Sequence, residues 1–323
     1  MKKNIWLKLG RLSSIIVVVA CSAGDPIETP PEVTGNDTIS ILGDPSFKKG
    51  LVLKRTNGST SNVIHPFGPG SGSPIWGMAE WGTRYFLTES DRVEDAHSVS
   101  YVNAGKTISF KKAPHAGNIA MQVTTSSEYV RPRREGEDWP HLLIEQSFPD
   151  QPFVKDLKGL ILHFRGKLTK AEMKMAQQDF NPGLHAAQFQ LFITVQNMNP
   201  NSAYYGDFLW FGIPFYDNRN AQIPVYAAKD IGKDDASGKF IYSAGTTDFM
   251  KGTFHGGNEV TIEKDIYPLI VNALKMAKQR GYLTGSFDGD FRITGMNLGW
   301  ELPGTFDVGF EINDFDISKV TQK

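Results

Sequence analysis

The chain has 323 residues, of which 40% are hydrophobic and 21% are charged, and its formal net charge is −1. This length suits one large domain or two small ones, and the near-neutral charge argues against a nucleic-acid-binding protein. The single cysteine excludes an internal disulfide bond.

Residues 1–20 combine a basic start with a short apolar run, which is typical of a secretory signal peptide. The basic residues are Lys2, Lys3, Lys8 and Arg11, and the apolar run covers residues 15–20. This run is too short to span a bilayer stably. Since residues 1–20 contain no acid, the chain that follows them carries a charge of −5.

The apolar run ends at Val18-Val19-Ala20-Cys21, which resembles the lipobox of bacterial lipoproteins. The resemblance implies lipidation at Cys21 and anchoring at the outer membrane or cell surface, since two or more acyl chains hold a protein stably. Residues 21–38 are polar and proline-rich, and they predict a flexible tether. Together these features resemble the surface lipoproteins of Bacteroidetes-type bacteria, many of which handle polysaccharides. A signal peptide with an incidental cysteine is the alternative.

From Ile39 onward, short apolar runs alternate with Gly, Pro, Asn and Asp, which is the pattern of an all-β protein. We expect residues 39–323 to form a single, mainly β domain, a β-sandwich of the jelly-roll or concanavalin-like type. This strand rhythm resembles the sandwiches of bacterial polysaccharide-handling lipoproteins, but it carries no catalytic motif. The strand candidates include residues 51–53, 85–87, 98–102, 107–110, 118–123, 160–165, 223–226, 240–242 and 260–262.

A basic patch that contains Arg133 precedes a strand with titratable side chains. Trp139 comes just before this strand, and alternation places His141, Leu143 and Glu145 on one face. An aromatic ring, an arginine and acid–base groups in one place fit a sugar-binding or catalytic site. A solvated sheet edge is the alternative interpretation.

Residues 170–179 have a helix-forming composition and predict a short helix. Residues 188–196 alternate as a strand with one apolar face for the core. The other face is rich in amides, as a sugar-binding sheet would be, although an ordinary solvated face has the same pattern. This second face carries Gln188, Gln190, Phe192, Thr194 and Gln196.

Residues 204–217 are the densest aromatic run of the chain. Alternation sends Leu209 and Phe211 to one side and Phe208 and Trp210 to the other. Large apolar groups on both sides predict a strand that is covered on both faces, by the core and by a second layer or a ligand.

Residues 265–280 form the most convincing helix pattern, with Asp265 as N-cap and Gly281 at the end. The apolar stripe should pack on the outside of the sandwich. Residues 291–302 and 306–317 read as strands, and Pro303-Gly304 between them predicts a hairpin turn. We expect the last strand to pair near the first.

The sequence contains no dinucleotide, phosphate-loop, zinc-protease or nucleophile-elbow motif, and its seven histidines are scattered. We therefore expect no cofactor and no metal. Asp288-Gly289-Asp290 could belong to a calcium loop, but an exposed turn explains it better.

Carbohydrate binding without chemistry is the function that these patterns favour. Sugar rings stack their C–H faces on aromatic side chains, and their hydroxyls bond to amides, carboxylates and arginine. The predicted partner is an oligo- or polysaccharide. The predicted ligand-binding residues are Trp139, Trp210, Gln188, Gln190 and Arg133.

Other functions stay open. A glycoside hydrolase needs two carboxylates across a cleft, and no spacing in the chain forces such a pair. The catalytic candidates are Glu145, Glu301 and His141, with Asp207, Asp217 and Glu311 as further carboxylates. A polysaccharide lyase would neutralise a uronate and use a Tyr or His base, for which the chain offers Arg133, His141, Tyr204 and Tyr205. An adhesin-type module that binds another protein is the third alternative.

Overall fold

The computed structural model describes residues 38–69, 72–231 and 236–321. The predicted signal peptide, the lipidation site at Cys21 and nearly all of the predicted tether lie outside these residues. Within the described ranges, no helix has the length and the apolar character needed to cross a membrane.

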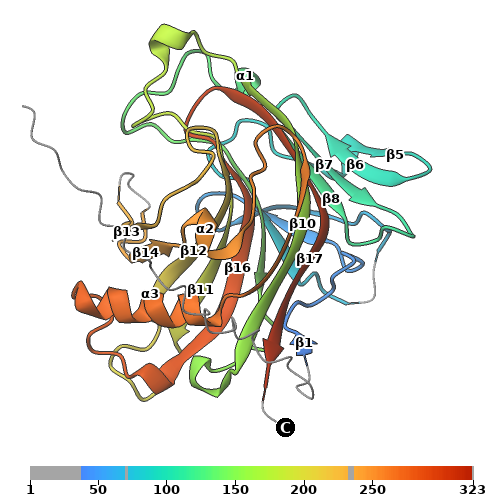
Figure 1. The fold of residues 1–323 in the computed structure, drawn as a ribbon. Coiled ribbons are helices and arrows are strands. Elements are labelled where there is room, and N and C mark those ends of the chain that lie inside the picture. Colours follow the sequence, from blue (N-terminus) through green and yellow to red (C-terminus); the bar gives the residue numbers. More distant parts are fainter. Residues whose placement is uncertain (1–37, 70–71, 232–235, 322–323) are drawn as a thin grey trace, which may run out of the picture. The chain divides into compact units, whose positions relative to one another are not determined.

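The described strands form two antiparallel-dominated sheets that pack as a sandwich (Figure 1), so the predicted mainly β fold is confirmed. The first sheet contains eight strands in the order β15-β10-β17-β8-β7-β6-β5, with β1 paired to β17. Its strands are β1 (Thr38–Ser40), β5 (Arg92–Glu94), β6 (Ser98–Val102), β7 (Lys106–Lys111), β8 (Ile119–Thr124), β10 (Gly159–Met173), β15 (Glu259–Asp265) and β17 (Phe306–Val320).

The second sheet contains nine strands in the order β13-β14-β12-β11-β16-β9-β4-β2-β3. Two of its pairs, β2 with β4 and β12 with β14, are parallel. Its strands are β2 (Leu51–Lys54), β3 (Thr60–Ile64), β4 (Trp76–Ala79), β9 (His141–Ser147), β11 (Gln188–Asn197), β12 (Phe208–Asp217), β13 (Tyr226–Lys229), β14 (Phe240–Ser243) and β16 (Phe291–Glu301).

Alternation along each strand builds the core between the sheets. On β11, Phe189, Leu191, Ile193 and Val195 are fully buried in it, as the sequence predicts. The rings of Phe189 and Phe310 stack across the two sheets with centroids 4.1 Å apart. The side chains of β11 that lie between these core residues therefore point to the outer face of the nine-stranded sheet.

Helix α3 (Tyr267–Gln279) contacts β10 of one sheet and both β12 and β14 of the other, and Figure 1 shows it beside these strands. It buries Ile270, Ala273, Leu274 and Ala277 against the core. The predicted packing of an amphipathic helix on the sandwich is thus confirmed. The Asp265 carboxylate accepts the N–H of Tyr267 (3.0 Å), although the residue in the capping position is Ile266.

The other described helical turns are short. They are α1 (Thr125–Glu128), α2 (Thr246–Phe249) and the 3₁₀ turns η1 (Glu89–Asp91), η2 (Val154–Asp156), η3 (Gln177–Asp179) and η4 (Asp288–Asp290). Asp288 pairs with Lys278, and Asp290 accepts a hydrogen bond from Asn199 (3.0 Å).

Three local predictions are wrong. Residues 85–87 form no strand, because side chains take the place of a partner strand: Thr83 accepts the N–H of Tyr85 (3.1 Å), and Glu80 accepts that of Leu87 (2.9 Å). Residues 170–173 continue β10 instead of starting a helix, because pairing with β17 extends to Met173↔Phe306 and overrides the local helix preference. The Pro303-Gly304 turn joins β16 of the nine-stranded sheet to β17 of the eight-stranded sheet, so it is a crossing between layers and not a hairpin. The expected pairing of the last strand with the first is confirmed by Thr38↔Val320.

Candidate functional site

Two adjoining cavities lie on the outer face of the nine-stranded sheet. Their volumes are about 400 and 310 Å³, and Trp81, Trp210 and Asn297 line both of them. We call the two cavities together the sheet cleft. Side chains of β9, β11, β12 and β16 form its floor, and nearby loops form its walls.

Strand β9 places acid–base groups in the sheet cleft. His141 and Leu143 line one cavity and Glu145 lines the other, while Leu142 and Ile144 between them are buried in the core. The predicted common face of the three outward residues is therefore confirmed.

His141 lies between two tryptophan rings. Its ring centroid is 5.4 Å from that of Trp81 and 5.6 Å from that of Trp139, and the second pair is stacked. The Nδ1 atom of His141 lies 2.9 Å from the carbonyl oxygen of Trp139. Because a carbonyl can only accept, Nδ1 carries the hydrogen in this network. The Nε2 atom then faces Glu301, whose Oε2 lies 3.7 Å away.

Glu145 occupies the other cavity and is neutralised by Lys54 of β2. Its carboxylate lies over Gly77 of β4, where a Cβ would come within 2.7 Å of Oε1. Glycine at position 77 is thus what lets this side chain lean across the sheet towards β2, away from β16.

The two glutamates predicted as catalytic both line the sheet cleft, but the strand register keeps them apart. Glu301 pairs with His141, whereas Glu145 pairs with Asn297, so the glutamates stand four residues apart along the ladder. Four residues of strand span about 13 Å. Retaining glycosidases separate their carboxyl groups by about 5–5.5 Å and inverting ones by about 6.5–9.5 Å. With Glu145 leaning away from β16, the pair does not match either geometry.

Asp217 is the carboxylate nearest to Glu301 in the ladder, because Gln188 of β11 pairs with both residues. Asp217 is only 2% exposed, and Arg219 binds both of its oxygens. Gln188 donates to the same carboxylate (3.0 Å). This buried carboxylate is therefore engaged by Arg219 and Gln188, and it does not line the sheet cleft.

Strands β11 and β12 supply the remaining floor. Phe192, Thr194 and Gln196 of β11 line the sheet cleft, as does Trp210 of β12. The indole N–H of Trp210 donates to Ser237 (3.1 Å), which fixes the ring while one face meets the cavity. The second face of the aromatic strand is thus directed at a cavity and not at another protein layer.

Three predicted ligand-binding residues do not line the sheet cleft. Gln188 donates a hydrogen bond to Asp217. Gln190 is only 7% exposed and lies where the register of β11 against β12 shifts. Arg133 is buried, donates to the carbonyl of Glu137 (2.7 Å) and lies 4.6 Å from the ring of Trp139. Arg133 therefore supports Trp139 from behind and does not reach a ligand in the cleft.

Two further residues of the site, Lys54 and Asn297, are not singled out by any pattern in the sequence. Lys54 and Asn297 come together with Glu145 only through pairing of distant strands, which one sequence does not show.

Among the described residues, the charges that line the sheet cleft are one lysine, Lys54, and three carboxylates, Glu145, Glu301 and Asp230. The cleft is therefore acidic on balance. Among the described residues, no group of three or more His, Cys, Asp or Glu side chains could hold a metal ion.

Neither a protein-family model nor a curated protein matches this chain. Solved structures match it at the level of overall architecture. A thermostable cellulase derived from Cel12A of Rhodothermus marinus is 14% identical, with 69% of this chain and 92% of that chain covered and a TM-score of 0.40. The native family 12 xyloglucanase from Bacillus licheniformis is 10% identical (72% and 99% covered, TM-score 0.42). The family GH12 endoglucanase 3 of Trichoderma harzianum is 12% identical (71% and 93% covered, TM-score 0.39). At this level the likeness concerns the fold alone.

Proposed function

We propose that this protein binds an oligosaccharide or polysaccharide in the sheet cleft. The observation that carries the proposal is the presence of three tryptophans, Trp81, Trp139 and Trp210, around one cavity. Indole faces pack on the C–H faces of sugar rings. Asn297 and Thr56 lie among them, and Thr194 and Gln196 line the adjoining cavity, where they offer partners for sugar hydroxyls.

The ligand is a neutral glycan by this proposal. A uronate-rich chain would bring negative charge into a cleft with three carboxylates and one lysine, and like charges repel strongly where water is partly excluded. Arg133, the cation considered for a lyase, is buried behind Trp139. Of its three candidate bases, Tyr204 and Tyr205 do not line the sheet cleft, and only His141 does. These placements weaken the lyase alternative.

Hydrolysis of the bound glycan is the second candidate function. The observation that favours it is the contact between Glu301 and His141 beside two tryptophans, because a half-buried carboxyl group next to an imidazole suits general acid–base work. In this scheme Glu301 protonates the leaving oxygen of the glycosidic bond, while water attacks the anomeric carbon and takes the place of the leaving group.

We also propose that the protein lies at the outer membrane or cell surface, anchored by lipid on Cys21, because Val18-Val19-Ala20-Cys21 resembles a lipobox. Mass spectrometry of the membrane-extracted protein would test this location. The expected result is an acylated N-terminal Cys21, and a soluble protein with an unmodified cysteine would contradict it.

The experiment that tests glycan binding is a panel of soluble polysaccharides. We would incubate the purified protein with mixed-linkage β-glucan, arabinoxylan, galactomannan, pectate and alginate, and measure retention by affinity electrophoresis and products by chromatography. Retention by at least one of the three neutral glycans is expected. If none of the five is retained or cleaved, the proposal fails and a protein-binding module becomes the better explanation.

Two substitutions locate the activity. Trp210→Ala should weaken glycan retention about tenfold, because a lost stacking ring costs on the order of 1.5 kcal/mol. Phe287→Ala is the matched control, since this ring is 72% exposed and does not line the sheet cleft. Glu301→Gln should stop any release of products and leave retention in place. Equal loss from both aromatic substitutions would place the glycan elsewhere.

A further inference from the structure

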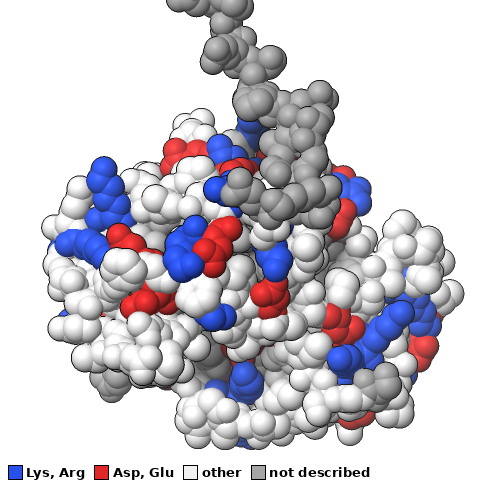
Figure 2. Space-filling view, turned by 90° about the horizontal axis from the view of Figure 1, so that it is seen from below, with Lys and Arg blue, Asp and Glu red and all other residues white. Residues whose placement is uncertain are grey.

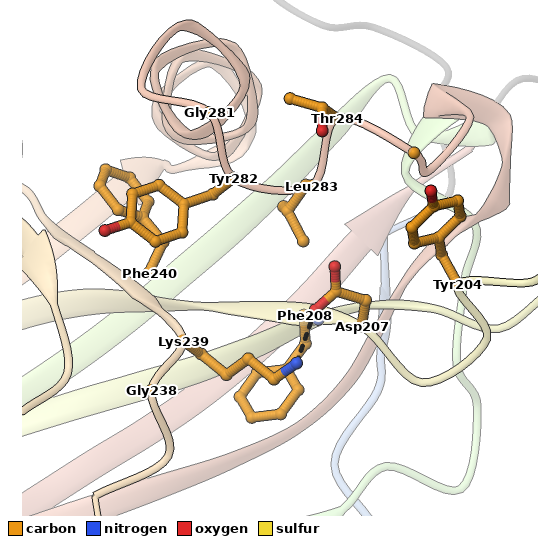
Figure 3. A pocket seen from close by; sticks show the side chains of 11 residues that line it. Tyr204, Asp207, Phe208, Gly238, Lys239, Phe240, Gly281, Tyr282, Leu283 and Thr284 are labelled. Carbon is orange, nitrogen blue, oxygen red and sulfur yellow. Dashed lines mark hydrogen bonds and ion pairs between the residues drawn. The ribbon is translucent and has the colours of Figure 1, made fainter.

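A separate cavity of about 250 Å³ lies near the sheet cleft, at the start of β12 (Figure 3). It is lined by side chains of the turn before β12, the loop before β14 and the segment after α3. We call it the tyrosine pocket, after Tyr204 and Tyr282. In Figure 3 these two rings stand on opposite sides of the cavity, with the Asp207 carboxylate between them.

Packing within the protein holds both rings in place. Tyr282 stacks on Phe240, with centroids 4.8 Å apart, and Phe240 is buried. Tyr204 packs against Gly285, where a Cβ would come within 2.0 Å of the ring. Any larger residue at position 285 would therefore displace Tyr204. Even so, the Tyr204 side chain is 51% exposed, so one part of this fixed ring faces solvent.

The floor of the tyrosine pocket is polar and balanced in charge. Lys239 donates to Oδ1 of Asp207 (2.7 Å), and the N–H of Phe208 donates to the same oxygen (3.1 Å). Among the described residues, Oδ2 of Asp207 receives no hydrogen bond, and the carboxylate is about a quarter exposed. An ion pair with a remaining acceptor, between two aromatic rings, suits a neutral ligand that carries hydroxyl groups.

Neighbouring residues of the chain line the tyrosine pocket and the sheet cleft. Phe208 lines the pocket, and its ring contacts that of Trp210 in the cleft, with centroids 5.0 Å apart. Ser237 lines the cleft, while Gly238 and Lys239 line the pocket. Gln196 of the cleft donates to the carbonyl of Gly206 (3.0 Å), in the turn that carries Tyr204.

We propose that the tyrosine pocket is a second sugar-binding position, which takes one unit of a neutral glycan that extends or branches beyond the sheet cleft. This inference rests on the proposed function. It adds that the protein binds long or branched chains better than short ones, because only these reach both positions.

The test uses a matched pair of substitutions. Tyr204→Ala removes the exposed ring, and Tyr205→Ala removes the neighbouring ring, which is 55% exposed and does not line the pocket. The probes are size-graded oligosaccharides, from trimers to octamers, of mixed-linkage β-glucan, arabinoxylan and galactomannan, measured by calorimetry. Tyr204→Ala should weaken binding of the longest probes about fivefold and leave the trimers unchanged, while Tyr205→Ala changes neither. Tyr204→Phe should restore the affinity.

The outcomes separate the two proposals. If Trp210→Ala weakens binding of all lengths while Tyr204→Ala matches Tyr205→Ala throughout, the tyrosine pocket is no sugar site but glycan binding in the cleft stands. If the unsubstituted protein binds none of the probes, both proposals fail. If Tyr204→Ala weakens trimers and octamers equally, the pocket is not a separate position, and the inference of a second site is overturned.

Discussion

At the scale of single residues, the most consequential buried charges of the described structure are Glu80 and Lys106. Both side chains are fully buried, and the Nζ of Lys106 lies 3.2 Å from Oε1 of Glu80. Glu80 also accepts the N–H of Leu87 (2.9 Å), and Lys106 donates to Thr83 (3.0 Å). Burial raises the pKa of Glu80 and lowers the pKa of Lys106, because each charge has lost its water. Each ion is therefore held in place by the other.

Replacing Lys106 alone should be more damaging than replacing both partners. Lys106→Met leaves Glu80 buried without its cation and should lower the free energy of unfolding by about 3–5 kcal/mol, whereas Glu80→Gln with Lys106→Met should cost much less. Because the pKa of Glu80 is raised in the folded protein, folding favours the protonated carboxyl group. The stability that Glu80 contributes through this shift is fully present below its unfolded pKa of 4.5, and it is lost as the pH rises through its pKa in the folded protein. The loss in free energy of unfolding caused by Lys106→Met should therefore become smaller as the pH falls towards 4.5. Urea unfolding from pH 7 to pH 4.5 checks this, and a deficit that stays constant would contradict it.

Single residues also show which parts of the candidate site can be predicted from the sequence. Local alternation correctly predicts that His141 and Glu145 share a face, since the period of a strand needs no tertiary knowledge. It does not predict that Arg133 turns behind Trp139, because that depends on a carbonyl of Leu184, some fifty residues away. The distance between Glu145 and Glu301 depends on the pairing register of β9 and β16, which a single sequence does not specify.

At the scale of elements, the local sequence alone correctly predicts where α3 ends. Gly281 has φ +84°, its N–H donates to the carbonyl of Lys278 (3.0 Å), and the N–H of Tyr282 donates to that of Ala277 (2.9 Å). These two bonds form a Schellman motif, which glycine favours because it adopts positive φ without strain. The motif also sends the chain to Tyr282, so the helix end positions one wall of the tyrosine pocket.

Substitution of Gly281 should therefore affect stability through conformation alone. A Cβ at this position would meet no atom within 4 Å, so Gly281→Ala should cost about 1–2 kcal/mol from the left-handed backbone. Gly281→Asn should cost less, because asparagine tolerates this conformation better. Denaturant midpoints of the three proteins check the order. Equal stability of the glycine and alanine forms would show that the helix end can rearrange.

Two of the wrong element predictions share a physical reason. Residues 170–173 prefer a helix locally, yet they extend β10 because β17 offers partners along its whole length. Pro303-Gly304 looks like a hairpin turn, yet β16 and β17 bury their apolar faces in the same core from opposite sheets. Strand existence follows from periodicity, but the sheet to which a strand belongs is decided by partners far away in the sequence.

At the scale of the whole molecule, the small net charge argues against strong attraction of an ionic ligand. Positive and negative side chains alternate on the face seen in Figure 2, with no extended region of one sign. The net charge is −1 for the full sequence and −5 for the chain that follows residues 1–20, and both values are small for this length. Long-range steering by charge is weak for such a surface, so recognition should depend on short-range contacts inside the sheet cleft and the tyrosine pocket.

Glycan binding should consequently be nearly independent of ionic strength. Stacking on Trp210 and hydrogen bonds to uncharged hydroxyls are not screened by salt, so the Kd for a retained neutral polysaccharide should change less than about twofold between 50 and 500 mM NaCl. Calorimetric titrations at several salt concentrations measure this directly. Trp210→Ala should weaken binding by the same factor at every concentration. A Kd that rises steeply with salt would instead show recognition of a charged chain, and it would contradict the neutral ligand inferred from Glu145, Glu301 and Asp230 in the cleft.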